Sequence, residues 1–311
     1  MGSVSRGVLW RILIGGGLLV ASPVIFAQSD AGNPNVACAA KNRSDTAKVG
    51  RYTFITYSSD AGECLQALSG SKVVFRRAVD GFERFTLGQP GDASEKLPAV
   101  ANGTDVTGRG RPDMVVSEYT GGAHCCTSHM VFELEPEFKL LATLNDADDD
   151  MAHFVRDAKD HRYNYITADW TFAYWPTCFA CSPSETVILR WADDAKGGGF
   201  HLALDKMRTP APKPAEWNKD LAAARKAVSE NAVDDMGQAL WGVVLNLIYS
   251  GHSDLAWKFV DEAGPKAQQK PFPALADFCG LLKQSPYWTD LQPTLKDTPP
   301  SCAGAKPVAN Q

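Results

Sequence analysis

The sequence has no excess of positive charge and none of the short motifs that mark common enzyme classes. Its 311 residues carry 31 Lys and Arg against 36 Asp and Glu, which gives a formal net charge of -5. A protein that binds nucleic acid electrostatically needs a basic patch or stripe, so we expect no nucleic-acid partner. The chain has no Gly-x-Ser-x-Gly elbow, no His-Glu-x-x-His, no P-loop and no dinucleotide fingerprint. An enzyme is therefore not predicted, and no catalytic residue is assigned.

A second long apolar run is also missing. The run that is present, Ile12–Ala27, follows Arg6 and Arg11. It is shorter than the roughly 20 apolar residues of a membrane-spanning helix, so residues 1–27 are predicted to be a signal peptide rather than an anchor. We expect an exported chain with no membrane span after cleavage, in the periplasm or, as the alternative, outside the cell.

The eight cysteines all follow the predicted signal peptide. They are Cys38, Cys64, Cys125, Cys126, Cys178, Cys181, Cys279 and Cys302. An even number in an exported chain favours disulfides over free thiols, because the compartment is oxidising. Proximity in the sequence pairs Cys38 with Cys64 and Cys279 with Cys302.

Two disulfide schemes are open for the other four cysteines. Either Cys125 and Cys126 cross-pair with Cys178 and Cys181, or a vicinal Cys125–Cys126 bridge stands beside a Cys178–Cys181 bridge. A trans peptide holds adjacent Cα atoms about 3.8 Å apart, below the usual 4.4–6.8 Å of a disulfide. A vicinal bridge would therefore be strained and easily reduced, which motivates a redox-switch hypothesis.

The fold class predicted is α+β, with a mostly antiparallel β domain followed by a small helical bundle. Between residues 51 and 204, short β-branched or aromatic runs alternate with Gly, Asp, Asn and Pro. Examples of the expected strands are Arg51–Tyr57, Lys72–Ala78, Phe82–Leu87, Met114–Tyr119, Ser128–Leu134, Tyr163–Ala168 and Thr186–Trp191. The expected divisions are a β-rich domain over residues 28–208, a Pro-rich linker over 209–215, a helical domain over 216–290 and a Pro-rich tail over 291–311.

Apolar residues recur at helical spacing after the linker. One stripe is Trp217, Leu221, Ala224 and Val228, and another is Met236, Leu240, Val243, Leu247 and Ile248. Gly251 suits a helix end, and Gly264 stops the next helix; a last helix is expected over residues 272–283. The segment 247–263 looks like one tetratricopeptide-type hairpin, but such stacks need about three repeats. A bundle packed on the β domain is therefore preferred, with Trp217, Trp241 and Trp257 as core anchors.

The segment Asp105–Asp113 resembles the Asp-rich loop of FG-GAP and VCBS-type repeats. In that family, side-chain oxygens at loop positions 1, 3, 5 and 9 surround a calcium ion, and a glycine occupies position 6. Asp105, Gly110 and Asp113 match, and Thr107 departs mildly, whereas Arg109 places a cation where a ligand belongs. We therefore hypothesise that the Arg109 guanidinium replaces the ion and bridges Asp105 and Asp113.

A more degenerate copy of this loop begins 52 residues later, at Asp157, with Lys159 and His161 at ligand positions. This spacing is near the roughly 40–50 residues of a propeller blade, but the β region is too short for a closed propeller. We expect propeller-like hairpins. The acidic run Asp146, Asp148, Asp149 and Asp150 is more typical of a solvated turn than of a metal site.

The segment Gly121–His129 resembles the Gly-Gly-Ala-His-Cys-Cys motif of uncharacterised exported bacterial proteins. The resemblance extends to Asp105–Asp113, Asp169–Trp175, Ser182-Pro183 and Ser285-Pro286-Tyr287-Trp288. It covers most of the chain after the predicted signal peptide, and it implies no known activity.

His124, Cys126, His129, Cys178 and Cys181 offer the soft ligands of a zinc or copper site, and Cys178 and Cys181 have metal-knuckle spacing. Neighbouring side chains on a strand point to opposite faces, however, so Cys125 and Cys126 do not readily share an ion. An oxidising compartment also favours disulfides. No cofactor is expected; zinc and calcium are the alternatives.

The aromatic segment Asp169–Trp175 would suit a sugar or peptide groove, but core packing is the preferred interpretation because aromatic runs are seldom exposed. The predicted role is an exported binding or scaffolding protein of the cell envelope, stabilised by disulfides, with an envelope protein or glycan as partner. The alternative is a metal-binding or thiol-redox-responsive periplasmic protein that uses the His-Cys-Cys and Cys-x-x-Cys cluster.

Overall fold

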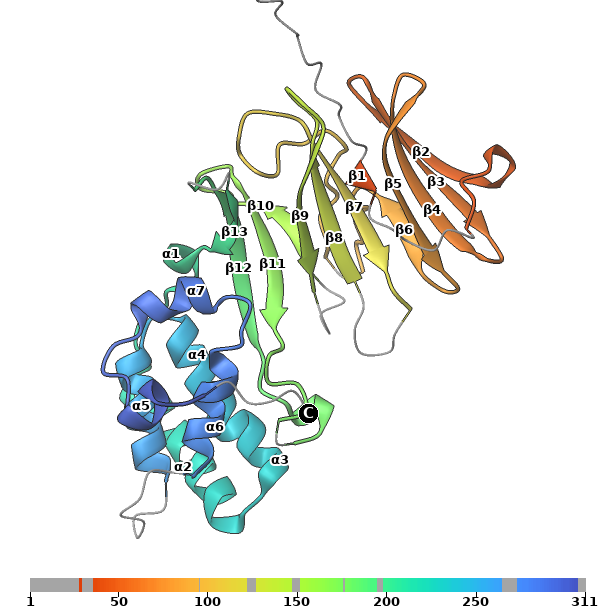
Figure 1. The fold of residues 1–311 in the computed structure, drawn as a ribbon. Helices are drawn as coiled ribbons and strands as arrows, with labels where there is room; N and C mark the ends of the chain where they lie inside the picture. The colour runs from red at the N-terminus through yellow and green to blue at the C-terminus, as the bar shows by residue number, and fades with distance from the viewer. Residues whose placement is uncertain are drawn as a thin grey trace, which may run out of the picture.

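The chain folds into three β-sheets followed by a set of helices (Figure 1). The structure is a computed structural model, and it describes residues 28–29, 36–94, 96–121, 127–146, 152–175, 177–194, 198–264 and 273–306. In Figure 1 the sheets follow one another across the molecule, and the helices lie beyond the third sheet. The predicted α+β class, with an antiparallel β part and a C-terminal helical part, is confirmed.

Each sheet contains an antiparallel meander of four strands in which spatial order follows chain order. The first consists of β2 (Arg43–Val49), β3 (Tyr52–Ser59), β4 (Gly62–Ser69) and β5 (Lys72–Asp80). The second consists of β6 (Arg84–Leu87), β7 (Asp113–Tyr119), β8 (Thr127–Glu133) and β9 (Lys139–Asn145). The third consists of β10 (His153–Arg156), β11 (Tyr163–Asp169), β12 (Glu185–Ala192) and β13 (Gly199–Leu202). A short strand, β1 (Gln28–Ser29), adds to β5 in parallel.

Tight turns fix the register of the first sheet. Val49 pairs with Tyr52 across the Gly50-Arg51 turn, and Gly50 has a φ of +56°. This left-handed conformation costs a glycine little because it has no Cβ atom, which explains why a two-residue turn forms there.

The central strands of the second sheet, β7 and β8, are buried on both faces. Successive residues of a strand point to opposite sides, so each of these strands contributes side chains to two cores. In β8, Met130 and Phe132 pack into a core with Phe75 of the first sheet, and the rings of Phe75 and Phe132 are 4.9 Å apart. Val131, between them, belongs to a separate core with Phe154 of the third sheet. The sheets therefore stack face to face in chain order.

The helical part begins after β13. Its elements are α1 (Leu204–Met207), α2 (Pro214–Glu230), α3 (Val233–Met236), the π-helix η3 (Gly237–Gly242), α4 (Val243–Tyr249), α5 (Ser253–Ala263), α6 (Pro273–Leu282), α7 (Trp288–Leu291), the 3-10 turn η4 (Gln292–Thr294) and α8 (Pro300–Ala303). The first apolar stripe forms α2. The second stripe is divided among α3, η3 and α4 because a wider π turn interrupts it. Such turns are often found at functional sites.

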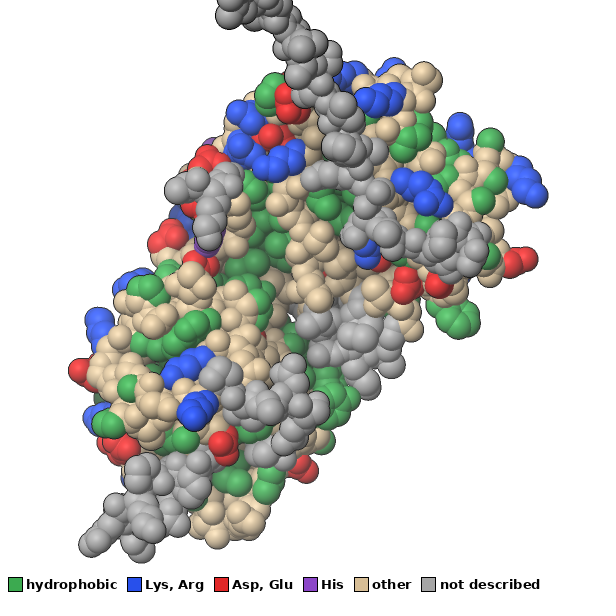
Figure 2. Space-filling model, in the orientation of Figure 1, with side chains coloured by type: hydrophobic (Ala, Val, Ile, Leu, Met, Phe, Trp, Pro, Cys, Tyr) green, Lys and Arg blue, Asp and Glu red, His purple; other side chains and the backbone are tan. Residues whose placement is uncertain are grey.

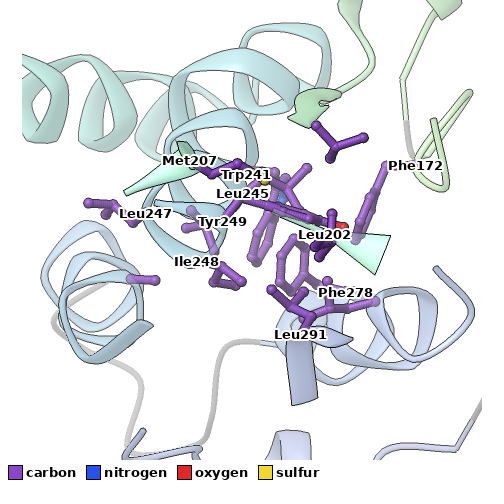
Figure 3. Close-up of a cluster of buried hydrophobic side chains, with 14 of the residues drawn as sticks. Phe172, Leu202, Met207, Trp241, Leu245, Leu247, Ile248, Tyr249, Phe278 and Leu291 are labelled. Carbon is purple, nitrogen blue, oxygen red and sulfur yellow. The ribbon is translucent and has the colours of Figure 1, made fainter. Parts of the chain in front are cut away.

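The third sheet and the helices share one core (Figure 3). The ring of Phe278 from α6 lies 4.8 Å from both Phe172, which follows β11, and Trp241 of η3. Trp241 and Trp257 are buried, as expected for core anchors, and Trp217 is partly buried against the same core. Helices and sheet therefore position one another through direct aromatic packing.

The predicted signal peptide, residues 1–27, lies outside the described residues. Helix α2 begins at Pro214, inside the predicted linker, and η4 and α8 lie inside the predicted tail. Within the described part of the chain, no helix has both the length and the apolar character needed to cross a membrane. On the face shown in Figure 2, charged side chains gather at the upper end of the β part and on the helices, with hydrophobic side chains between them.

Candidate functional site

The first Asp-rich loop joins β6 to β7 and is held together by its own backbone and by Thr107. The Asp105 carboxylate accepts hydrogen bonds from the backbone N–H of Arg109 at 2.9 Å and of Gly110 at 2.8 Å. The Thr107 hydroxyl lies 3.3 Å from Asp105 Oδ1 and donates to Asp113 Oδ2 at 2.9 Å. Thr107 therefore joins the two aspartates that open and close the loop.

The hypothesis that Arg109 bridges Asp105 and Asp113 is wrong. The Arg109 guanidinium instead pairs with Glu133 at 2.8 Å and with Asp193 at 3.4 Å, and it lies over the ring of Trp191. The physical reason is that both oxygens of Asp105 already accept backbone N–H groups, so the cation gains more from Glu133. Arg109 thus connects the second sheet to the third.

Asp113 is the least satisfied carboxylate of this loop. Only 1% of the residue is exposed, and Oδ1 has no hydrogen-bond partner. Burial raises the pKa of Asp113 from 3.8 to about 6, although the Thr107 N–H and hydroxyl act in the opposite direction.

The second Asp-rich loop, between β10 and β11, occupies the equivalent place in the third sheet. Asp157 accepts from Arg190 and Lys206, each at 2.9 Å, and Asp160 accepts from the same two side chains at 2.7 and 3.1 Å. The hydrogen bond from Lys206 lowers the pKa of Asp157, and that from Arg190 lowers the pKa of Asp160. Two protein cations therefore neutralise these carboxylates.

His129, one of the predicted metal ligands, belongs to a buried polar cluster between the second and third sheets. Its Nδ1 lies 2.8 Å from Asp146 Oδ2 and 2.7 Å from the Tyr165 hydroxyl, which also donates to Asp146. Asp146 is 1% exposed, so the expectation of a solvated turn is wrong for this residue. Asp148, Asp149 and Asp150 lie outside the described residues.

The six described cysteines form three disulfides. These are Cys38–Cys64, Cys178–Cys181 and Cys279–Cys302. The two pairings predicted from proximity are confirmed. The cross-paired scheme is wrong, because Cys178 is bonded to Cys181, three residues away. His124, Cys125 and Cys126 lie outside the described residues, so the vicinal bridge stays a prediction.

The Cys178–Cys181 bridge closes a small loop, residues 177–182, which we call the disulfide loop. Asp234 of α3 accepts hydrogen bonds from the Thr177 hydroxyl and the Cys178 N–H, and these bonds lower its pKa. One Asp234 oxygen and the two sulfur atoms lie within 4.8 Å of one another. This group does not contain His129, and its sulfur atoms are bonded to each other, so the predicted metal set is not assembled among the described residues.

Helix η3 holds the other side of the disulfide loop. The Gln238 side-chain amide donates to the carbonyl of Ser182 at 2.7 Å and lies 3.4 Å from that of Cys181. A Cβ atom on Gly237 would lie only 2.1 Å from the Cys181 carbonyl oxygen. The loop backbone therefore rests directly on the π-helix, and only glycine leaves room for that contact.

The aromatic segment Asp169–Trp175 divides between core and surface. Phe172 is fully buried and Trp175 packs against Trp241, as the core interpretation predicts. Tyr174, in contrast, is 60% exposed and has a φ of +61°, a left-handed conformation that side chains other than glycine seldom adopt. The hydroxyl of Ser182 accepts the Tyr174 N–H at 2.8 Å and so holds this conformation. Exposed residues held in such conformations are typical of binding sites.

Asp169 anchors this region to the helices. Its carboxylate accepts from the Tyr249 hydroxyl of α4, from Ser285 at 2.8 Å and from the Thr171 N–H at 2.9 Å. Glu185, its partner across β11 and β12, accepts from Asn246 of α4. Burial, with the neighbouring Asp169 charge, raises the pKa of Glu185 to about 7.

An open groove of about 590 Å³ runs between α2, the α3–η3 corner and the disulfide loop. Its apolar lining consists of small side chains, among them Ala223 and Ala227 of α2 and Ala239 of η3, so the backbone lies close to the groove. Cys181 forms part of the wall, which places the bridge at the groove itself.

Charged side chains surround this groove unevenly. They are Asp220 and Lys226 of α2 and Asp234 and Asp235 of α3. Sequence reasoning identified Cys181 of the wall but missed these four residues. They are scattered polar positions in the sequence, and only the turn between α2 and α3 brings them together.

No protein-family model, no curated protein and no solved structure matches this chain.

Proposed function

We propose that the protein is an exported binding or scaffolding protein of the cell envelope, and that the groove beside the disulfide loop receives a segment of its partner. The groove itself carries this proposal. It is large, open and lined by small side chains, and it is bordered by the disulfide loop, which Asp234 and Gln238 hold in place through hydrogen bonds. Concave sites with a few directed polar groups are the usual form of binding sites.

The charges of the groove favour a protein partner over a neutral glycan. Asp220, Asp234 and Asp235 outnumber Lys226, so a segment with lysine or arginine side chains has complementary charge. Disulfides suit an oxidising compartment, which supports export; of the periplasm and the cell exterior, we propose the periplasm.

Two neighbouring alanines of α2 supply the test. Ala223 lines the groove, whereas Ala222 is exposed outside its lining. The protein would be isolated from its native oxidising compartment with Ala223→Trp or Ala222→Trp. We expect Ala223→Trp to fill the groove and to remove a partner that copurifies with the wild type and with Ala222→Trp. Equal recovery of the partner from both variants would refute the proposal.

We further propose that the second and third sheets derive from a repeat similar to FG-GAP and VCBS repeats. The two Asp-rich loops join the first strand to the second in successive sheets, and this shared position supports the proposal. Thr107 and backbone N–H groups in one loop, and Arg190 with Lys206 in the other, would then stand in place of calcium.

A thiol-redox or metal-dependent role of the disulfide loop is the second candidate. The observation in its favour is that Cys178 is exposed in a Cys-x-x-Cys bridge. A dithiol would reduce the bridge with two electrons and two protons and would itself become a disulfide. The two freed thiols would lose their protons on binding a metal ion and, with Asp234, would offer three ligands. The Asp234 carboxylate, however, disfavours a nearby thiolate and so stabilises the bridge. Alkylation of Cys178 and Cys181 in a glutathione buffer of cellular potential would support the candidate, and complete protection would end it.

A further inference from the structure

A second cavity, of about 320 Å³, lies in the C-terminal helical part, far along the chain from the disulfide loop. We call it the C-terminal pocket. Its walls come from Trp257 of α5, Leu282 at the end of α6, Trp288 of α7, and Leu295, which follows η4. The Cys279–Cys302 disulfide, which joins α6 to α8, closes one side. The described lining is mainly hydrocarbon, aromatic ring and sulfur, and Gln292 and Thr298 are its uncharged polar side chains.

The pocket is held open by contacts that leave its walls little freedom. The indole N–H of Trp257 donates to the Lys296 carbonyl at 2.9 Å, and the Lys296 N–H donates to Ser253 at 2.8 Å. Trp257 is only 5% exposed, and its one polar atom is already bonded. The pocket is partly open to solvent, and concave apolar pockets of this size are the usual form of a binding site for a small molecule.

The charge of the pocket has one sign. Lys283 is the only ionisable side chain among the described lining residues, and no carboxylate lies among them. Its ammonium group donates to the carbonyls of Ala303 at 3.1 Å and Ala305 at 2.8 Å, which holds it against α8. An ammonium group has three protons, so Lys283 can donate one further hydrogen bond beyond these two.

We propose that the C-terminal pocket binds a small monocarboxylate with a hydrocarbon body, whose chain lies between Trp257 and Trp288 and whose carboxylate pairs with Lys283. A neutral hydrocarbon would make no hydrogen bond with the Lys283 ammonium group. A protonated amine would be repelled by the positive charge of that group. The pocket lies at the small end of the usual range for ligand sites, so the chain is of medium length. This inference does not depend on the groove beside the disulfide loop.

The test uses straight-chain carboxylates of increasing length, from hexanoate to dodecanoate, and the alcohols of the same lengths. Binding would be measured by calorimetry and by the fluorescence of the pocket tryptophans. Each added methylene should increase affinity about fourfold until the pocket is full, because burial of apolar surface drives binding. Each carboxylate should bind about tenfold more tightly than its alcohol, because its bond to Lys283 is charge-assisted.

Lys283→Met should remove the preference for carboxylate and leave the affinity for the alcohols unchanged. Lys296→Met is the matched control, since that side chain carries the same charge but does not line the pocket, and it should retain the preference. Leu295→Trp should block both series. The comparison of acid with alcohol in the wild type needs no variant, so it stands even if Lys283→Met loosens α8. Failure of every chain length to bind, or equal affinity for acids and alcohols, would overturn the proposal.

Discussion

At the scale of single residues, the two Asp-rich loops show how a protein can keep the shape of a cation-binding loop with its own donors. Asp105 is satisfied by backbone N–H groups, and Asp157 and Asp160 by Arg190 and Lys206. Asp113 is the exception, because one of its oxygens is buried without a partner. Its ionisation must therefore oppose folding at neutral pH.

Asp113→Asn should stabilise the protein above pH 6. The folded pKa of about 6 lies above the unfolded value of 3.8, so the contribution of Asp113 to stability is full below pH 3.8 and is lost as the pH rises through 6. The asparagine keeps an oxygen for Thr107 and carries no charge. We expect a gain of about 2 kcal/mol at pH 8 that disappears near pH 4. Urea unfolding of both proteins between pH 4 and 8 measures this difference, and a difference that does not vary with pH would contradict this explanation.

The bonds of Arg190 to the second Asp-rich loop give a second prediction at this scale. Arg190→Met leaves Asp157, Asp160 and Asn164 without their shared donor, so it should lower the melting temperature by several degrees. Arg156→Met, on the edge strand β10 of the same sheet, removes an exposed side chain that, among the described residues, donates to the His161 carbonyl, and it should have little effect.

A chelator should leave the wild-type melting temperature unchanged, because protein donors already occupy the two loops. Thermal unfolding with and without EDTA tests this point. A large fall with EDTA would mean that a bound cation, and not Arg190, carries the stability of these loops.

At the scale of elements, the π-helix η3 links the helices to the disulfide loop. Gly237 contacts the loop backbone directly. At Gly242, the other end of η3, an added Cβ atom would first meet the flexible end of the Gln238 side chain, at 3.3 Å. The two glycines therefore have different reasons to be present, although both lie in one short helix.

Gly237→Ala should destabilise the protein by about 2 kcal/mol, because the new methyl group would displace the Cys181 carbonyl. Alanine is the better helix former by up to about 1 kcal/mol, so a purely local view predicts the opposite sign. Gly242→Ala is the matched variant and should be neutral or slightly stabilising. Denaturant midpoints of the two variants decide the matter, and equal values would show that the loop does not rest on η3.

The elements that the sequence predicts are those with a strong apolar signal. The expected strand Met114–Tyr119 corresponds to β7, and the stripe beginning at Trp217 corresponds to α2. Strand β2 carries mostly exposed polar side chains and lies at a sheet edge, so it has no alternation to detect. The groove was not predicted, because its wall combines Cys181 with Asp234, which are far apart in the sequence. Long-range packing, which leaves no local pattern, determines such a site.

At the scale of the whole molecule, the second sheet connects two cores. Phe132 faces the core shared with the first sheet, and its neighbour Val131 faces the core shared with the third sheet and the helices. Because one strand belongs to both cores, a substitution that destabilises either core should lower the stability of the whole chain.

Phe132→Ala and Val131→Ala should therefore lower one common unfolding transition. We expect losses of about 3–5 kcal/mol for the phenylalanine and about 2 kcal/mol for the valine, from lost burial and the cavities left behind. Calorimetry with far-ultraviolet circular dichroism follows strands and helices together. Separate transitions, with Phe132→Ala moving one and Val131→Ala the other, would show that the two cores unfold independently.

If the groove beside the disulfide loop is where the protein meets its partner, a probe placed in the groove must touch that partner, and site-specific photocrosslinking detects such contact. A photoreactive residue would replace Ala223 or Ala239, which line the groove, and Ala222, which does not. Irradiation would follow in the native oxidising compartment. We expect one adduct of the same mass from Ala223 and Ala239 and none from Ala222. An adduct from Ala222 alone, or equal adducts from all three positions, would contradict the proposed role of the groove.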